Sequence, residues 1–211
     1  MEGYLEEKAQ GENKKEFTMG HGHKFDPSKL ARLKDPERFT YLDPEKIWNL
    51  LGDNINTVID LGAGIGIFSI RFASFVPRGK VYACELSAEM LNHLQKEIEE
   101  SGVKNVEAIK TEEVHIPLPD DVADALVMIN LHHEFDHPED SLRETLRLLR
   151  PGGTVAIIDW KPEETPSGPP LYVRALPKDV RKQLEATGFQ NTQEHEILPY
   201  HFVTTSQKPT S

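Results

Sequence analysis

The sequence predicts an α/β fold, with a sheet built from successive strand-helix units. Short β-branched runs alternate with stretches whose apolar residues recur at helical spacing, a pattern typical of such units. The clearest unit is residues 57–76, where the apolar run 57–61 breaks into three glycines at alternate positions before helical periodicity resumes. With 211 residues, the chain is long enough to form one domain with a full core.

The remaining elements follow the same alternation along the chain. We expect strands at 57–61, 80–85, 105–109, 123–130 and 153–159, and helices at 66–76, 87–101 and 138–150. Pro151-Gly152-Gly153 should end the third of these helices before the fifth strand begins. A last helix begins near Leu176 and ends at Gly188, and the closing runs 190–197 and 200–206 predict a hairpin.

The N-terminal region divides into two parts. Residues 1–18 are charged and lack periodicity, so we expect a mobile tail. Residues 19–52 contain three Asp-Pro pairs, beginning at Asp26, Asp35 and Asp43. In each pair the Asp can cap a helix and the Pro can take its first position. A minimal sheet does not need these helices for its own core, so we expect 19–52 to be a helical cover over the main domain at 53–211. The aromatic area that such a cover requires would come from Phe25, Phe39, Tyr41 and Trp48.

Composition narrows the functional classes. The net charge of -11 disfavours nucleic acid, whose phosphates would be repelled. Mean hydropathy is -0.51 and no apolar run approaches the length of a membrane span, so a cytoplasmic protein without a membrane partner is expected. One cysteine excludes an internal disulfide, and no cluster at metal-ligand spacing indicates a metal site.

The glycine-rich turn predicts a nucleotide-type ligand. Glycines let the backbone approach a ligand closely, and Glu85 ends the next strand, where an acid can accept hydrogen bonds from ribose hydroxyls. The spacing is Asp60-x-Gly62-x-Gly64-x-Gly66, whereas dinucleotide folds prefer G-x-G-x-x-G. A carboxylate beside the turn would repel a pyrophosphate but suits a ligand that carries an ammonium group.

Taken together, five segments resemble class I S-adenosylmethionine-dependent methyltransferases, and specifically the small enzymes similar to those of ubiquinone/menaquinone biosynthesis. The resemblance spans roughly residues 40–206 and rests on 58–66, 81–87, 116–120, 125–133 and 146–153. It implies a Rossmann-like, seven-stranded sheet, mostly parallel with an antiparallel last strand and helices on both faces. It also implies S-adenosylmethionine as cofactor and a small-molecule acceptor.

The resemblance further implies a set of cofactor-binding residues. They are Asp60, Gly62, Ala63, Gly64, Glu85, Leu86, Glu112, Glu113, Asn130 and Leu131. In this assignment Asp60 binds the ammonium group, Glu85 holds the ribose and Leu86 packs under the adenine. Glu112 accepts from the exocyclic amine of the adenine, and Glu113 adds a backbone N–H.

The acceptor side is less defined. In the family, one ring of a pair such as His132 and His133 packs under the sheet edge and the other faces the pocket, where it could deprotonate the acceptor. We therefore treat both histidines as catalytic candidates. Asp159-Trp160 could form the floor for the acceptor, and the Pro-rich segment 161–170 is either a lid or a surface crossover.

Two other functions stay open from the sequence. One is a non-catalytic cofactor-binding protein on the same fold, and the other is an NAD-type oxidoreductase. The missing G-x-G-x-x-G pattern counts against the second. The acceptor and its methylated atom are not determined by the residues, nor is the oligomeric state.

Overall fold

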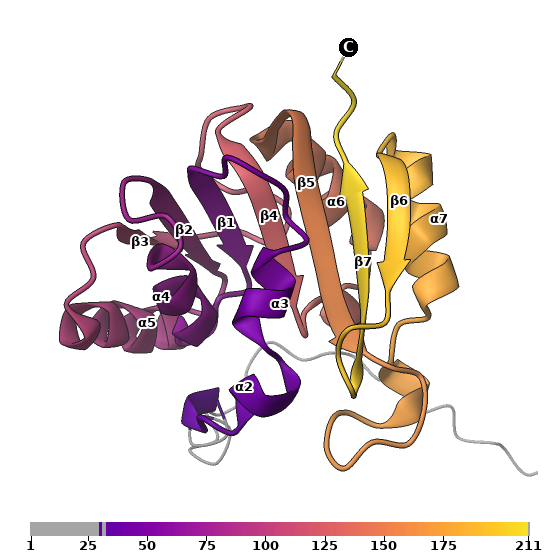
Figure 1. Cartoon of the computed structure of the whole chain (residues 1–211), viewed down its shortest axis with the longest axis horizontal. Coiled ribbons are helices and arrows are strands. Elements are labelled where there is room, and N and C mark those ends of the chain that lie inside the picture. Colours follow the sequence, from indigo (N-terminus) through magenta and orange to yellow (C-terminus); the bar gives the residue numbers. More distant parts are fainter. Residues whose placement is uncertain (1–29, 31–32, 211) are drawn as a thin grey trace, which may run out of the picture.

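A computed structural model describes residue 30 and residues 33–210 of the chain. Its centre is a seven-stranded sheet with the strand order β3-β2-β1-β4-β5-β7-β6 (Figure 1). The strands are β1 Thr57–Leu61, β2 Lys80–Glu85, β3 Val106–Lys110, β4 Ala123–Ile129, β5 Leu149–Trp160, β6 Gln190–His195 and β7 His201–Gln207. The first five are parallel, and β7 runs antiparallel to both β5 and β6. The predicted mostly parallel sheet with an antiparallel last strand is confirmed.

Helices cover both faces of this sheet (Figure 1). They are α2 Arg38–Tyr41, α3 Pro44–Trp48, α4 Ile67–Ala73, α5 Ala88–Ser101, α6 Pro138–Leu148 and α7 Pro177–Thr187, with short 3-10 turns η1 His132–Glu134 and η2 Leu171–Val173. Alternate strand residues supply the two cores. Val58 packs with α3 and α4, while its neighbour Ile59 packs with α6 and α7.

The junction between α6 and β5 differs from the prediction. The helix ends at Leu148 and the strand begins directly at Leu149, so Pro151-Gly152-Gly153 lies inside the strand. The pairing with β4 shifts register between Ala123 and Ala125, and Gly152 takes a φ of +79°. The β5 strand therefore accommodates the turn-like residues as an irregularity, which residue pattern alone does not reveal.

Two of the three Asp-Pro pairs fall in the described part of the chain. Asp43 caps α3 as predicted, because its side chain accepts from the backbone N–H groups of Glu45 and Lys46. Asp35 instead accepts from the N–H of Glu37 at 2.9 Å, and α2 begins only at Arg38. Asp26 lies outside the described residues, as does the expected tail at 1–18.

The segment around α3 also belongs to the core, contrary to the expectation that the sheet does not need it. Leu42 and Ile47 are fully buried, and Leu51 is 1% exposed. All three pack in the same cluster as Val58 of β1 and Phe72 of α4. Removing this segment would therefore expose the face of the sheet, not only its edge.

Within the described ranges, no helix combines the length and the apolarity that crossing a bilayer requires.

Candidate functional site

A pocket of about 930 Å³ lies at the carboxyl ends of the parallel strands. This is the edge where α2 and the 161–170 segment approach the strand tips (Figure 1), and it is where open α/β sheets bind ligands. All ten predicted cofactor residues line it: Asp60, Gly62, Ala63, Gly64, Glu85, Leu86, Glu112, Glu113, Asn130 and Leu131. The volume is in the range of small-molecule sites.

The glycine turn is held by β2. The N–H groups of Gly62 and Ala63 donate to the carbonyl of Cys84 at 2.9 and 3.0 Å, and Gly64 N–H donates to Glu85 Oε2 at 2.9 Å. Gly64 has a φ of +58°, and a Cβ there would meet other side chains only at 3.9 Å, so this position opens into the pocket. Because these three N–H groups are already paired, the turn presents carbonyl oxygens, which suit an ammonium group.

The carboxylate of Glu85 has free acceptor positions that could bind the hydroxyls of a ribose. Its second oxygen accepts from Ser87 N–H at 2.7 Å, so each oxygen holds one backbone N–H. A carboxylate offers about four acceptor positions, which leaves one free position on each oxygen for two neighbouring hydroxyls. Burial raises the pKa of Glu85, and the two backbone hydrogen bonds only partly oppose that rise.

Asp60 is a buried acid beneath the turn. It is 3% exposed, and its Oδ2 accepts from Ser69 Oγ at 2.5 Å. Burial raises its pKa to about 6, although the Ser69 hydrogen bond acts in the opposite direction. A cationic ligand in the pocket would stabilise the charged carboxylate and lower this pKa.

Asn130, at the tip of β4, has a left-handed backbone. Its φ is +57°, a conformation that asparagine adopts more readily than most other residues. Its side-chain Oδ1 is buried with no hydrogen-bond partner among the described residues. A buried acceptor without a donor is costly, so the pocket fits a ligand that brings an N–H donor to this oxygen.

The two histidines are separated by the structure. His132 is buried, and its Nε2 lies 2.9 Å from Gln183 Oε1. It does not line the pocket, so its ring lacks the access to a bound acceptor that the catalytic prediction required. His133 lines the pocket. Its Nδ1 lies 2.8 Å from Asp159 Oδ1, and its backbone N–H donates to Asp159 Oδ2 at 3.0 Å.

Asp159 supports His133 and does not form the floor of the pocket, which corrects the sequence-based expectation. Its side chain is fully buried, whereas the neighbouring Trp160 does line the pocket. Burial lowers the pKa of His133, but the hydrogen bond and charge of Asp159 outweigh burial and raise it overall. The pair has the geometry of an oriented general base.

Several lining residues were not among the predicted site residues. They include Arg38, Phe68, Met90, Phe135 and Glu144. The ring of Tyr41 of α2 lies 6.4 Å from the ring of Trp160. Phe39 packs on Phe68 at 5.4 Å. No local motif marks these residues, because each reaches the pocket through tertiary packing.

Two other aromatic residues were expected in the cover. Trp48 instead packs against Phe72 and Phe75 at ring distances of 5.9 and 5.1 Å, in the core. Phe25 lies outside the described residues.

Part of the 161–170 segment reaches the pocket, through Ser167, Gly168 and Pro169. Arg174 anchors it by donating to the carbonyls of Lys161, Glu163 and Pro169 at 2.9, 2.7 and 2.9 Å. The same guanidinium lies 5.6 Å from the Trp160 ring. The segment therefore forms a wall of the pocket.

Acidic side chains dominate the charged groups of the pocket wall. Six acidic residues line it: Asp60, Glu85, Glu112, Glu113, Glu134 and Glu144. Among the lining residues that the structure describes, Arg38 is the one lysine or arginine. Such a field disfavours a pyrophosphate and favours a ligand with positive groups and one carboxylate, which is the charge distribution of S-adenosylmethionine.

Comparisons with known proteins agree with this geometry. A family model described as a methyltransferase domain matches residues 58–153. A SAM-dependent methyltransferase from Aquifex aeolicus is 37% identical, with a TM-score of 0.82 over 88% of this chain and 100% of that one. The [4+2]-cyclase SpnF shares the fold, with a TM-score of 0.66 over 80% of each chain, at 17% identity.

A curated relative is the ubiquinone/menaquinone biosynthesis C-methyltransferase UbiE of Pseudomonas savastanoi pv. phaseolicola. It is 31% identical over 107 residues, which are 50% of this chain and 42% of the relative. The similarity to UbiE thus spans less than half of that protein. The Aquifex protein, in contrast, is matched along its whole length. On this evidence the chain belongs to the class I S-adenosylmethionine-dependent methyltransferases.

Proposed function

We propose that this protein transfers a methyl group from S-adenosylmethionine to a weakly acidic small-molecule acceptor, with His133 as the general base. The observation that carries the proposal is the position of His133, paired with the buried Asp159, in the same pocket as the Asp60–Gly64 turn and Glu85. When bound, the cofactor supplies a methyl group that its sulfonium has already activated for in-line displacement. The protein therefore contributes mainly alignment, desolvation and proton removal.

The cofactor half of the pocket divides the ligand's groups among its residues. Asp60, the turn carbonyls and Asn130 Oδ1 take the ammonium. Glu85 takes the ribose hydroxyls, while Leu86, Glu112 and Glu113 surround the adenine. For the carboxylate we assign Arg38, because the turn N–H groups of Gly62, Ala63 and Gly64 are already paired.

The acceptor half supplies the base and an aromatic wall. With Nδ1–H donating to Asp159, a neutral His133 keeps Nε2 as the proton acceptor. Tyr41, Phe135 and Trp160 line the same space and suit a flat, largely apolar molecule. Leu131 lies where the two halves meet. Its side chain is so close to the glycine turn that a Cβ added at Gly62 would come within 2.8 Å of it.

The competing functions make different predictions for one pair of experiments. Calorimetric titration should show tight binding of S-adenosylhomocysteine and none of NAD. Incubation with methyl-labelled cofactor and a panel of small phenols, enols and amines should then transfer label to at least one acceptor.

Binding without any transfer would support the non-catalytic alternative. NAD binding would overturn the proposal.

A further inference from the structure

The segment that follows β3 carries the residues assigned to the adenine, yet it contains no helix or strand between residues 111 and 122. Its shape must therefore be fixed by contacts from elsewhere. We infer that Arg147 of α6 is a positioning residue that holds this segment against the purine and so sets both cofactor affinity and selectivity for the 6-amino group. The inference rests on the proposed roles of Glu112 and Glu113.

Arg147 reaches across to three acceptors of the segment. Its Nη1 donates to the carbonyl of Leu118 at 2.9 Å and to Asp120 Oδ1 at 2.7 Å. Its Nη2 donates to the carbonyl of Ile116 at 3.0 Å. One side chain thus fixes two backbone carbonyls immediately after the adenine-binding residues.

The same guanidinium also forms hydrogen bonds with Glu144, one turn earlier on α6. Nε donates to Glu144 Oε2 at 2.8 Å and Nη2 donates to Oε1 at 2.6 Å. Glu144 Oε1 in turn accepts from the backbone N–H of Ile116 at 2.7 Å. Ile116 is therefore held at both its N–H and its carbonyl by one arginine–glutamate pair.

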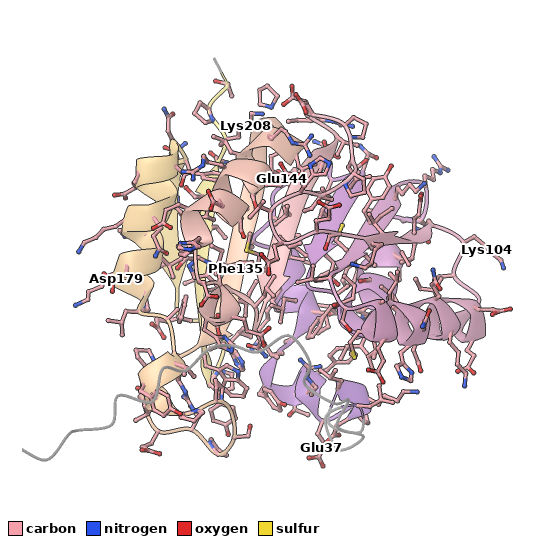
Figure 2. All side chains as sticks on the ribbon, turned by 180° about the vertical axis from the view of Figure 1, so that it is seen from behind. Glu37, Lys104, Phe135, Glu144, Asp179 and Lys208 are labelled. Carbon is pink, nitrogen blue, oxygen red and sulfur yellow. The ribbon has the colours of Figure 1, made fainter. Side chains whose placement is uncertain are left out.

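This pair borders the ligand space. Glu144 is labelled on α6 in Figure 2, which views the sheet from the face opposite to that of Figure 1, and both Glu144 and Ile116 line the pocket. Within the segment itself, Glu112 N–H donates to the carbonyl of His115 at 3.0 Å. Fixing Ile116 thus fixes the turn that presents Glu112.

The geometry demands an arginine in particular. Five contacts use the planar fork of the guanidinium in three directions, whereas a lysine ammonium is a single point that cannot reach both the carbonyls and both oxygens of Glu144. Arg147→Lys keeps the charge and most of the volume but should free the segment. It is therefore the informative variant, with Arg147→Ala as the complete deletion.

The test is a titration of the full chain with S-adenosylhomocysteine and with its 6-oxo analogue, S-inosylhomocysteine. In the wild-type protein the 6-amino compound should bind more tightly, because the 6-oxo group presents an acceptor to Glu112. Arg147→Lys should weaken S-adenosylhomocysteine by about tenfold, the scale of one lost charge-assisted hydrogen bond. It should also reduce the preference between the two ligands.

Arg150→Ala is the matched control. Arg150 lies three residues further along, in β5, and donates to the carbonyl of Asp121 at 3.3 Å, at the end of the segment remote from Glu112, and to Asp124 Oδ1 of β4 at 2.7 Å. These hydrogen bonds go to Asp121 and Asp124 and not to Ile116 or Glu144, so the loss of Arg150 should lower thermal stability and leave both affinities unchanged.

The outcomes separate the possible failures. Failure of the wild-type protein to bind S-adenosylhomocysteine would overturn the proposed function itself. Unchanged affinity and preference in Arg147→Lys, or an equal loss for both ligands, would overturn the positioning role while leaving the proposed function intact. If Arg147→Ala does not fold, faster amide exchange at Glu112 and Glu113 in Arg147→Lys would support the role, and unchanged exchange would overturn it.

Discussion

The two halves of the pocket are built in different ways. The half proposed for the cofactor comprises the tips of β1 and β2 and the segment after β3, together with Asn130 and Arg38. The half proposed for the acceptor comprises His133, Trp160, Tyr41 and the 161–170 segment. In the cofactor half, backbone groups of neighbouring strands hold one another, as when Gly62 and Ala63 donate to the carbonyl of Cys84. Such contacts follow directly from parallel pairing.

The acceptor half depends on contacts between segments far apart in the chain. Tyr41 meets Trp160, and His133 depends on Asp159. Arg174 holds the wall that includes Pro169. The comparison teaches that the half proposed for the cofactor is encoded mainly by local sequence, whereas the half proposed for the acceptor is encoded in tertiary packing.

The largest effect on ligand affinity is expected from a substitution in the glycine turn of the cofactor half. Gly64→Val should reduce binding of S-adenosylhomocysteine by more than about a hundredfold, roughly 3 kcal/mol. A β-branched residue both strains the left-handed backbone and occupies ligand space. The measurement is calorimetric titration.

Gly102→Val controls for backbone strain. Gly102 also has a left-handed backbone, with a φ of +74° and nothing within 4 Å of a Cβ, but it caps α5 away from the pocket. Both variants should lose stability, and only Gly64→Val should lose binding. Normal binding by Gly64→Val would show that the turn is not the cradle.

The next largest effect is expected on turnover, from a substitution of His133 that affects the acceptor half alone. His133→Asn should lower kcat by about 10²–10⁴-fold, the usual contribution of a general base, and leave affinity for S-adenosylhomocysteine unchanged. Asn can still donate to Asp159, so the variant removes the base without leaving that buried acid unpaired. His132→Asn is the comparison and should retain most turnover.

The pH dependence of turnover in the wild-type protein is a second test of the His133–Asp159 pair. Because His133 acts in its neutral form, turnover should rise with pH through a pKa above the usual histidine value, as Asp159 raises it. Loss of turnover in both histidine variants alike would argue for a structural effect.

Glu85→Ala tests whether the cofactor half uses side chains as well as backbone. We expect affinity for S-adenosylhomocysteine to fall by about 1.5–3 kcal/mol, the scale of hydrogen bonds to a charged group. Stability should also fall slightly, since the N–H groups of Gly64 and Ser87 lose their acceptor. Glu89→Ala, in the first turn of α5, is the control, and equal affinity in the two variants would remove the ribose assignment.

The smallest effect concerns Asp60 and pH. Its pKa is raised to about 6 in the folded protein without ligand, whereas the unfolded chain releases this proton near pH 4. The contribution of Asp60 to the free energy of unfolding therefore declines as the pH rises from about 4 to 6. The ammonium group of a bound ligand favours the charged form of Asp60. Affinity for S-adenosylhomocysteine should therefore rise about tenfold between pH 5 and 7.

Asp60→Asn should flatten that dependence in both the unfolding and the binding measurements. A pH dependence unchanged by the substitution would assign it to another group and remove Asp60 from the ammonium site.

By itself, the sequence determined the sheet and most of the cofactor half. β-branched runs, alternate glycines and helix caps are local signals, because strand pairing and turn geometry act over a few residues. The run 57–61, the turn at Gly62–Gly66 and the acid at Glu85 therefore predicted the strands and the pocket residues that the structure brings together.

Only the tertiary structure decided the acceptor half and the limits of β5. Nothing within the pair His132-His133 says which ring faces the pocket; that follows from Gln183 and Asp159, which approach from α7 and β5. Likewise Arg147, Arg174 and Arg38 look like ordinary surface cations in the sequence. Their roles arise from carbonyls and rings supplied by distant segments, and side-chain partners at that separation leave no periodic trace along the chain.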